Sequence, residues 1–149
     1  TPASDIELTD FNAKPASLYN IQAAYTIVAF WDPTCGHCKE VLPKLDSIYR
    51  AKWKAQGVKI FAVAKETEGT KADWQKFVKD NKITDWTNVY YSKAADKART
   101  DNSIPGYSQL YDVQSFPTLY LLDKDKRIIA KKLTYQQLDE IIQLKQKGQ

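Results

Sequence analysis

The sequence contains little cysteine, little glycine and no methionine. Among its 149 residues are two cysteines, five glycines and a single histidine. A small secreted scaffold held together by disulfides normally spreads roughly four or more cysteines along the chain, and this sequence does not. Its two cysteines, Cys35 and Cys38, lie three positions apart. That spacing favours chemistry at one site over a link between distant segments.

Long apolar runs and clusters of one charge are missing as well. No stretch reaches the ~18 apolar residues typical of a membrane-spanning helix, so we expect no membrane span. The net charge is +4, and the lysines are mixed with acidic residues. Because nucleic-acid binding needs clustered positive charge, we expect no nucleic-acid partner. The chain begins at Thr1 without a methionine or a recognisable signal peptide, which favours a processed product or an excised domain.

Apolar residues make up 43% of the chain, and their periodicity predicts a single α/β domain spanning residues 1–149. Residues 25–31 and 58–64 are apolar on both alternating faces, as in strands that are covered on both sides. Between them, apolar residues recur at helical spacing after the cysteine pair, and Gly57 predicts the end of that helix. Strand, helix and strand in this order predict a parallel sheet. Before them, apolar residues on either side of a turn at 12–14 predict a hairpin with strands near 6–11 and 18–21.

The second half of the chain predicts further elements of the same domain. Residues 66–102 are polar and weakly periodic. Thr134, followed by Gln137 three positions later, predicts a capped start for the last helix. The other predicted elements are a helix at 72–78, a strand at 89–91, a short helix at 107–111, a strand at 118–122 and its partner at 128–130. Together they predict a central mixed sheet flanked by helices.

The cysteine pair lies where the first buried strand is followed by a helix. The first turn of a helix has free backbone N–H groups and a partial positive charge, and both stabilise a thiolate. We therefore expect Cys35 to ionise readily and to act as the nucleophile in disulfide exchange, helped by a protonated His37 beside it. Cys38, one helical turn further along, is placed to resolve the mixed disulfide and to form an internal bond.

Other interpretations of the pair were weighed against this one. A structural disulfide between Cys35 and Cys38 is an open alternative. A zinc site needs a full tetrahedral set of ligands, and the chain offers two cysteines and one histidine that lies between them, so we expect no metal. A c-type haem needs histidine directly after the second cysteine, and Lys39 stands there.

Two prolines add to the predicted site. Pro43 lies within the predicted helix and removes a hydrogen bond to the carbonyl of Lys39. We expect a kink that leaves the cysteine-bearing turn exposed, with a local irregularity of no functional role as the alternative. Pro117 directly precedes a strongly apolar run, where a tight connection can contain a cis bond.

Two segments resemble the thioredoxin superfamily. Its active-site segment is similar to residues 30–39, which read Phe-Trp-Asp-Pro-Thr-Cys-Gly-His-Cys-Lys, and its cis-proline loop is similar to residues 116–118, which read Phe-Pro-Thr. The N-terminal hairpin, Pro43 and the long insert between Ala64 and Tyr107 resemble the TlpA/ResA-like branch of extracytoplasmic bacterial oxidoreductases. The Cys-Gly-His-Cys-Lys segment resembles a style that is common in Bacteroides-type bacteria. The resemblance covers residues 4–145. It implies a thioredoxin-like fold with an N-terminal hairpin and a central insert.

The resemblance also implies roles for the residues of these two segments. Cys35 is the exposed nucleophile, and Cys38 is the buried resolving thiol. Pro117 is cis, faces the pair and offers backbone groups to a substrate strand, and its neighbours Phe116 and Thr118 bind substrate with it.

The residues around the cysteines have implied supporting roles. Trp31 flanks the site. Gly36 and His37 form the dipeptide of protein disulfide isomerases, which favours the reduced form of the pair. A reduction potential less negative than that of ordinary thioredoxin is therefore implied.

Two positions depart from the family pattern. Thioredoxins carry a buried acid for proton transfer in the strand before the cysteines, and Ala29 stands at that position. Several TlpA/ResA-like proteins carry a glutamate three residues after the second cysteine, where this chain has Val41, with Glu40 one residue earlier. Glu40 is therefore a candidate for proton transfer, together with Lys65 and Glu66 at the end of the second strand.

These implications predict a protein thiol–disulfide oxidoreductase outside the cytoplasm. Its redox-active group is the Cys35–Cys38 disulfide without a further cofactor, and its substrates are protein disulfides or dithiols. A redox partner protein supplies or removes electrons. We expect a monomer in the periplasm or another extracytoplasmic compartment, with membrane anchoring through a missing N-terminal segment as an option. The direction of electron flow stays open, and cytochrome c maturation is one family role that fits.

Two alternative functions are kept. The missing buried acid favours a redox-sensing or partner-binding module of an envelope protein. A peroxidase is disfavoured, because peroxidases of this superfamily use a Thr-x-x-Cys pattern with an arginine nearby.

Overall fold

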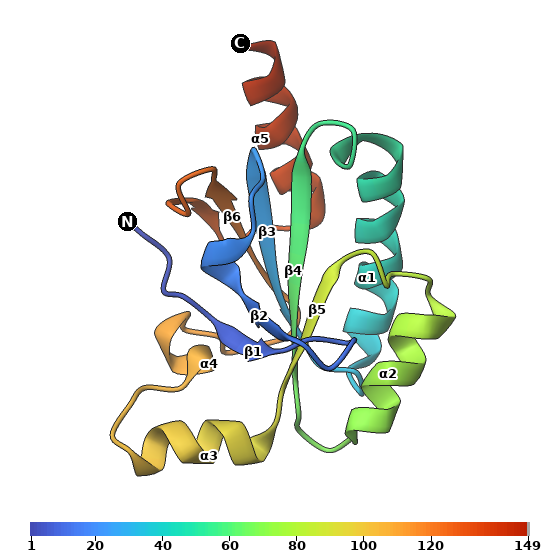
Figure 1. The fold of residues 1–149 in the computed structure, drawn as a ribbon. Helices are drawn as coiled ribbons and strands as arrows, with labels where there is room; N and C mark the ends of the chain where they lie inside the picture. Colours follow the sequence, from blue (N-terminus) through green and yellow to red (C-terminus); the bar gives the residue numbers. More distant parts are fainter. Residues whose placement is uncertain (149) are drawn as a thin grey trace.

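A computed structural model describes residues 1–148 and has a five-stranded mixed sheet at its centre (Figure 1). Its strands are β3 (Tyr25–Trp31), β4 (Val58–Lys65), β5 (Thr87–Tyr91), β6 (Thr118–Asp123) and β7 (Ile128–Lys131). They lie in the order β5-β4-β3-β6-β7. The first three run parallel, whereas β6 and β7 are antiparallel to their neighbours. The predicted fold class, a central mixed sheet flanked by helices, is confirmed.

Each face of the sheet carries its own apolar core. Alternate residues of a strand point to opposite faces, so Ile27 and Ala29 of β3 belong to one core while Val28 and Phe30 belong to the other. The first core is covered by α1 (Gly36–Ile48), α2 (Lys71–Asp80) and α5 (Tyr135–Lys147). The second lies beneath β1 (Glu7–Thr9), β2 (Pro15–Ser17), the 3-10 turn η1 (Leu18–Asn20) and α4 (Tyr107–Leu110). Cys38 is part of the first core, so the cysteine pair is anchored on that side.

The helix that follows β3 extends beyond α1. It continues as a π-helical turn, η2 (Tyr49–Trp53), and the chain then turns at Gly57, whose φ of +81° favours glycine. Trp53 is fully buried, and its Nε1 donates a hydrogen bond to Asp139 of α5 at 3.0 Å. Burial of a large apolar side chain stabilises a fold by ~1.5–3 kcal/mol. The predicted end of the helix at Gly57 is confirmed, whereas the π-helical turn was not predicted.

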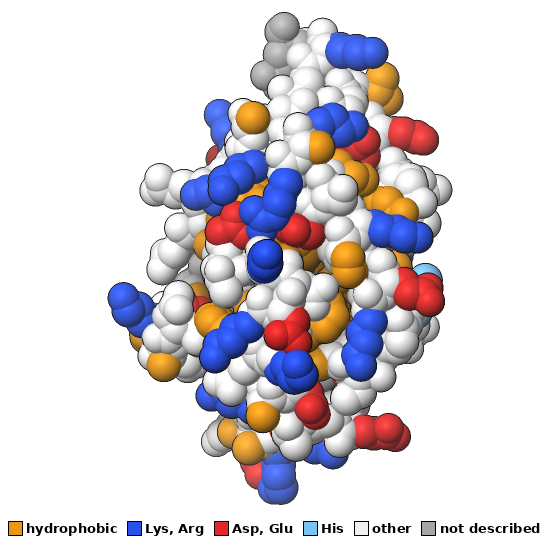
Figure 2. Space-filling view, turned by 90° about the vertical axis from the view of Figure 1, so that its right-hand side faces the viewer, with side chains coloured by type: hydrophobic (Ala, Val, Ile, Leu, Met, Phe, Trp, Pro, Cys, Tyr) orange, Lys and Arg blue, Asp and Glu red, His pale blue; other side chains and the backbone are white. Residues whose placement is uncertain are grey.

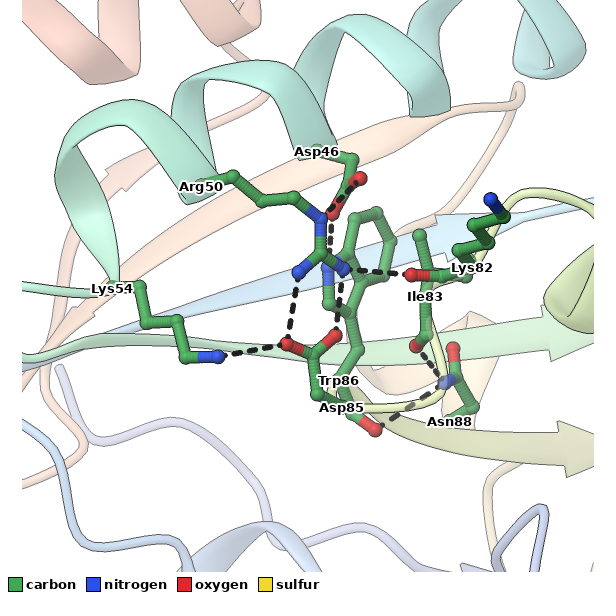
Figure 3. Close-up of polar contacts among 8 residues, drawn as sticks. All are labelled: Asp46, Arg50, Lys54, Lys82, Ile83, Asp85, Trp86 and Asn88. Carbon is green, nitrogen blue, oxygen red and sulfur yellow. Dashed lines mark hydrogen bonds and ion pairs between the residues drawn. The ribbon is translucent and has the colours of Figure 1, made fainter.

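An ion-pair network joins α1 and η2 to the loop before β5 (Figure 3). Arg50 donates to Asp46 at 2.9 Å, to both carboxylate oxygens of Asp85 at 2.8 and 3.1 Å, and to a backbone carbonyl at 2.7 Å. The indole Nε1 of Trp86 donates to the other oxygen of Asp46 at 3.0 Å. We call this set the Arg50 network; it consists of Asp46, Arg50, Lys54, Lys82, Asp85 and Trp86. It fixes the helix that carries the cysteines at the end far from them.

The hairpin is confirmed, but its second strand is shorter and lies earlier than predicted. β2 ends at Ser17 and pairs with β1, whereas residues 18–20 form η1. Leu18 is completely buried in the second core, which accounts for its apolar character without a strand. The apolar residues of this segment therefore anchor a turn against the sheet.

The stretch between Ala64 and Tyr107 contains α2 and β5, which confirms the helix predicted at 72–78 and the strand predicted at 89–91. β5 lies within it and pairs with β4, and α2 covers the first core, so both belong to the sheet domain itself. An additional helix, α3 (Lys93–Asp101), was not predicted. It begins with the Ser92 hydroxyl accepting a hydrogen bond from the Ala95 N–H at 3.0 Å. None of its residues is fully buried, so its sequence lacks the apolar stripe that predicts a helix.

The face that carries α1 and α2 shows positive and negative side chains next to each other (Figure 2). Apolar groups lie between them in small separate areas on this face. Within residues 1–148, no helix is long and apolar enough to cross a bilayer.

Candidate active site

Cys35 lies at the N-cap position of α1, directly after β3. Its Sγ accepts a hydrogen bond from the backbone N–H of Cys38 at 3.4 Å, and its thiol lies 3.7 Å from the carbonyl oxygen of Phe116. Cys35 is half-buried, whereas Cys38 is completely buried, and both are free thiols. One sulfur is therefore accessible from outside, and the second lies behind it on the next helical turn.

The turn between β3 and α1 is held in place by Asp32. The carboxylate of Asp32 accepts hydrogen bonds from the backbone N–H and the hydroxyl of Thr34, both at 2.8 Å. Its backbone carbonyl accepts a further hydrogen bond from the Cys35 N–H at 3.0 Å. These contacts fold residues 32–35 into a compact turn, and that turn aims the Cys35 sulfur at the positive end of the helix.

The two sulfurs lie in unequal environments. Burial raises the pKa of the Cys38 thiol well above its usual range. A hydrogen bond from the Asp32 backbone acts in the opposite direction, while the Cys35 thiol and the charge of Asp32 add to the rise. Cys38 therefore remains protonated at neutral pH and is not the thiol that reacts first.

The proline loop lies opposite the cysteines. The Phe116–Pro117 peptide bond is cis, and the carbonyl oxygen of Phe116 is the group nearest to the Cys35 thiol across the site. The ring of Phe116 packs against both cores, which fixes the position of the loop. The Thr118 hydroxyl donates to the carbonyl of Ser115 at 2.7 Å, so this side chain supports the loop from within.

A groove of about 510 Å³ runs beside the proline loop and the first turns of α1. It is lined from α1 by His37, Glu40, Val41 and Lys44, from the proline loop by residues 114, 115 and 117–119, and from the start of α5 by residues 132–136. An extended peptide that contacts Pro117 can continue into this groove, because Pro117 is part of its lining. The groove offers both acidic and basic side chains to such a peptide.

The structure places the predicted supporting residues as follows. Trp31 is completely buried and packs against Phe77 with ring centroids 4.9 Å apart, so it supports the site from below and does not face a substrate. His37 is exposed on the first turn of α1 and lines the groove. Space is open around the position that a Cβ would occupy at Gly36.

The three candidates for proton transfer lie on α1 and at the end of β4. Glu40 is exposed and faces the groove. Lys65 donates to the carbonyl of Glu66 at 3.0 Å and lies above the ring of Tyr91. The Glu66 carboxylate accepts a hydrogen bond from the Lys93 N–H at 2.8 Å. Within the described residues, none of the three has a hydrogen bond to either sulfur.

Asp32 is the site residue that the sequence interpretation missed. Asp-Pro-Thr was interpreted only as a turn, and the carboxylate does form that turn. A second contact of this carboxylate could not be predicted from the sequence, because its partner is distant. The carboxylate also accepts a hydrogen bond from the hydroxyl of Thr67 at 2.5 Å, 35 residues further along the chain. The available signal was an acidic residue at the end of a strand that is apolar on both faces.

The described part of the chain contains no group of three or more His, Cys, Asp or Glu side chains that could hold a metal ion.

A cysteine pair at the start of a helix, facing a proline loop at the end of a mixed sheet, defines a thioredoxin-fold protein with a two-cysteine centre. The thioredoxin-like family profile matches residues 23–128, and the chain belongs to that family.

The proteins similar to this chain are named for thiol–disulfide chemistry. The chain is 27% identical over 144 residues to the thiol-disulfide oxidoreductase ResA of Bacillus cereus, covering 95% of this chain and 75% of that protein. A domain of a possible thiol-disulfide isomerase from Cytophaga hutchinsonii has a TM-score of 0.80 and 34% identity, covering 99% and 92% of the two chains. The thioredoxin domain of a thiol-disulfide oxidoreductase from Bacteroides vulgatus has a TM-score of 0.76 and 25% identity, covering 95% and 96%.

Proposed function

We propose that this protein is a protein thiol–disulfide oxidoreductase whose redox centre is Cys35-Gly36-His37-Cys38. One observation carries the proposal: a half-buried sulfur at the N-cap of α1 has a completely buried thiol one turn behind it. This arrangement separates an attacking sulfur from a resolving sulfur. The names of the similar proteins support the same reaction class.

In the direction that reduces a substrate, the reaction has two steps. The Cys35 thiolate attacks one sulfur of a substrate disulfide; a Cys35–substrate bond forms, the substrate disulfide breaks, and the departing sulfur takes up a proton. Cys38 then loses its proton and attacks the Cys35 sulfur, which forms the Cys35–Cys38 disulfide and releases the second substrate sulfur. Two electrons pass from the cysteine pair to the substrate. The opposite direction uses the same steps in reverse.

The proline loop and the adjacent groove are the proposed binding site for protein substrates. The backbone around Pro117 pairs with an extended substrate segment, with Phe116 and Thr118 fixing the loop. A redox partner protein restores the starting state of the cysteine pair, and no further cofactor takes part. We propose an extracytoplasmic location and a monomer, with cytochrome c maturation as one setting in which such a reaction is needed.

Reduction of insulin by dithiothreitol tests the proposed function. The wild-type protein should accelerate the appearance of turbidity, and Cys35→Ser should reduce the rate to that of dithiothreitol alone, because no attacking sulfur remains. Cys38→Ser should also stop turnover but should accumulate a mixed disulfide that is visible by mass spectrometry. A Cys35→Ser variant with wild-type turnover would refute the assignment.

A redox-sensing module is the second candidate function. It is favoured by Ala29, which is completely buried and places no acid beside the cysteines in β3. A sensor should switch reversibly between dithiol and disulfide with its partner but should not accelerate insulin reduction above the dithiothreitol background. The wild-type rate in the same assay therefore distinguishes the two candidates.

A further inference from the structure

Asp32 is a buried carboxylate whose two oxygens contact two different segments. It is 8% exposed, and no lysine or arginine of residues 1–148 forms an ion pair with it. Its Oδ1 accepts hydrogen bonds from the N–H and the hydroxyl of Thr34, both at 2.8 Å, in the turn before Cys35. Its Oδ2 accepts a hydrogen bond from the hydroxyl of Thr67 at 2.5 Å, in the loop between β4 and α2. A carboxylate offers an acceptor oxygen to both segments, whereas an asparagine amide has only one oxygen.

The loop that carries Thr67 is fixed independently of the cysteines. At one end of the loop, the Glu66 N–H donates to the backbone carbonyl at the end of β5 at 3.0 Å, and the Glu66 carboxylate accepts a hydrogen bond from the Lys93 N–H at 2.8 Å. At the other end, Thr70 and Asp73 form the capping box of α2. The Thr67 hydroxyl is therefore held by elements that lie outside the cysteine segment.

The Cys35 sulfur depends on the turn that Asp32 holds. The N–H of Cys35 donates to the Asp32 carbonyl at 3.0 Å, and its Sγ accepts the Cys38 N–H at 3.4 Å as the N-cap of α1. The same turn packs against the loop between β4 and α2, because a Cβ placed on Gly69 would lie 2.4 Å from the Thr34 methyl group. The helix N-terminus stabilises a negative sulfur, whereas a sulfur in a disulfide carries no charge. Displacement of the turn therefore destabilises the dithiol form relative to the disulfide form.

We propose that Thr67 is a positioning residue for Cys35 and acts through the Asp32 carboxylate. The inference rests on the proposed function and adds to it a residue from outside the cysteine segment. The Thr67 hydroxyl holds one carboxylate oxygen, the other oxygen holds the turn, and the turn holds the sulfur at the helix N-terminus. Without this hydroxyl, the buried carboxylate loses a hydrogen bond that compensates its charge, so it moves towards solvent and displaces the turn.

Equilibration of the cysteine pair with glutathione tests the inference. As the pair is reduced, two glutathione thiols become one glutathione disulfide, and the fraction of reduced protein, measured by alkylation and mass spectrometry, gives the equilibrium constant for reduction. Thr67→Val keeps the shape of the side chain and removes the hydroxyl, so this constant should fall by ~3–10-fold. Thr67→Ser keeps the hydroxyl and should leave the constant within about twofold of the wild-type value.

Thermal unfolding of both redox forms separates positioning from general support of the fold. A contact that only supports the fold lowers the Tm of the dithiol and disulfide forms equally and leaves the glutathione equilibrium unchanged, whereas Thr67→Val should lower the Tm of the dithiol form more. Thr26→Val is the matched control, because this buried threonine also lies on β3 side of the site and its hydroxyl has no hydrogen-bond partner within residues 1–148. Neither the equilibrium constant nor the difference in Tm between the redox forms should change in this control.

A double variant tests whether Thr67 acts through Asp32. In an Asp32→Ala background, Thr67→Val should change the equilibrium constant by less than about twofold, because the carboxylate that joins the loop to the turn is absent. An effect of Thr67→Val that persists in full without the carboxylate would show that the hydroxyl acts by another route, and it overturns the inference.

The remaining outcomes are equally decisive. A wild-type equilibrium constant in Thr67→Val overturns the inference, and so does a Thr67→Ser variant that is shifted as far as Thr67→Val. If Thr67→Val does not fold, Thr67→Ala takes its place with the same expected fall, because it removes the hydroxyl without the bulk of valine. Failure of the wild-type protein to accelerate insulin reduction contradicts the proposed function itself and is measured separately from the glutathione equilibrium.

Discussion

Two carboxylates at opposite ends of α1 show how differently this fold treats negative charge. Asp85 is about one-third exposed and is held by Arg50 and Lys54, in the Arg50 network (Figure 3). Asp32 is buried, has no cationic partner among the described residues and accepts three hydrogen bonds from threonines and backbone. The first arrangement stabilises a loop at low cost. The second joins the turn before Cys35 to the loop between β4 and α2.

An exposed carboxylate that is paired with cations and a buried carboxylate without a cation have different roles in this fold. An exposed ion pair contributes modestly to stability and is screened by salt, so it serves to hold the fold. A buried carboxylate without a counter-ion is costly unless hydrogen bonds compensate it, so its donors have to be placed accurately. The site therefore has hydroxyl groups where the Arg50 network has a guanidinium.

The largest effect on turnover should come from removing the Asp32 carboxylate, and removal of the Asp85 carboxylate is the comparison. Asp32→Ala should lower insulin-reduction turnover by ~10–100-fold, because it removes the contacts that form the turn before Cys35 and join it to the loop of Thr67. Asp85→Ala should leave turnover within about twofold, because the Arg50 network lies at the far end of the helix. Equal effects of the two substitutions on turnover would contradict the view that Asp32 and Asp85 differ in their importance for the reaction. Initial rates at matched protein concentration provide the comparison.

A smaller effect is expected from the packing of the two loops around Asp32. Gly69→Ala places a methyl group 2.4 Å from the Thr34 Cγ2 and 2.8 Å from an Asp73 oxygen, so Thr34 has to move away from Asp32. Turnover should fall by ~3–10-fold through misplacement of the turn. Adding Thr34→Ser, which keeps the hydroxyl and removes the methyl group, should restore part of the loss. A double variant no better than Gly69→Ala would show that Thr34 is not the residue displaced.

The smallest effect concerns the stability that the Arg50 network provides. Arg50 holds the pKa of Asp85 below its usual value of 3.8 through hydrogen bonds, with burial acting in the opposite direction. A depressed carboxyl pKa contributes stability above the unfolded value, and this is lost as the pH falls through the folded value. Arg50→Gln should therefore lower stability by ~0.5–1 kcal/mol at pH 7, or ~1–4 °C in Tm.

Thermal unfolding at two pH values checks this prediction. The difference in Tm between wild type and Arg50→Gln should become smaller as the pH falls below 3.8 and through the lower pKa of Asp85 in the folded chain, where the carboxyl becomes protonated in both states. A difference that grows towards acid would show that the network acts through something other than the charge of Asp85. Turnover at pH 7 is the accompanying control and should not change.

Local signals were sufficient to predict most of the framework. The alternating residues of 25–31 and 58–64 predicted β3 and β4 because both faces of these strands are buried. The capping box of Thr134 and Gln137 predicted the start of α5, and both of its hydrogen bonds are present. The start of α1 at the cysteine pair followed from the change of periodicity at Trp31. Each of these features is contained within a few neighbouring residues.

Features that depend on distant contacts could not be predicted in this way. α3 has no fully buried residue, so its sequence carries no apolar stripe. The segment around Leu18 was predicted as a strand. In so short a segment, the apolar residues of a strand and the buried side chain of a turn give the same pattern. Asp32 became a site residue only once the fold placed Thr67 beside it. The roles of Glu40 and Glu66 in proton transfer stay predictions.

Reactivity of the two sulfurs in the reduced protein tests the account most directly. Iodoacetamide labelling at pH 7, followed by unfolding, a second label and mass spectrometry, measures each cysteine separately. We predict that Cys35 reacts at least ~100-fold faster than Cys38, because only Cys35 is accessible at the N-terminus of α1 while Cys38 is buried and protonated. Equal rates, or faster labelling of Cys38, would contradict the division of the pair into an attacking and a resolving thiol.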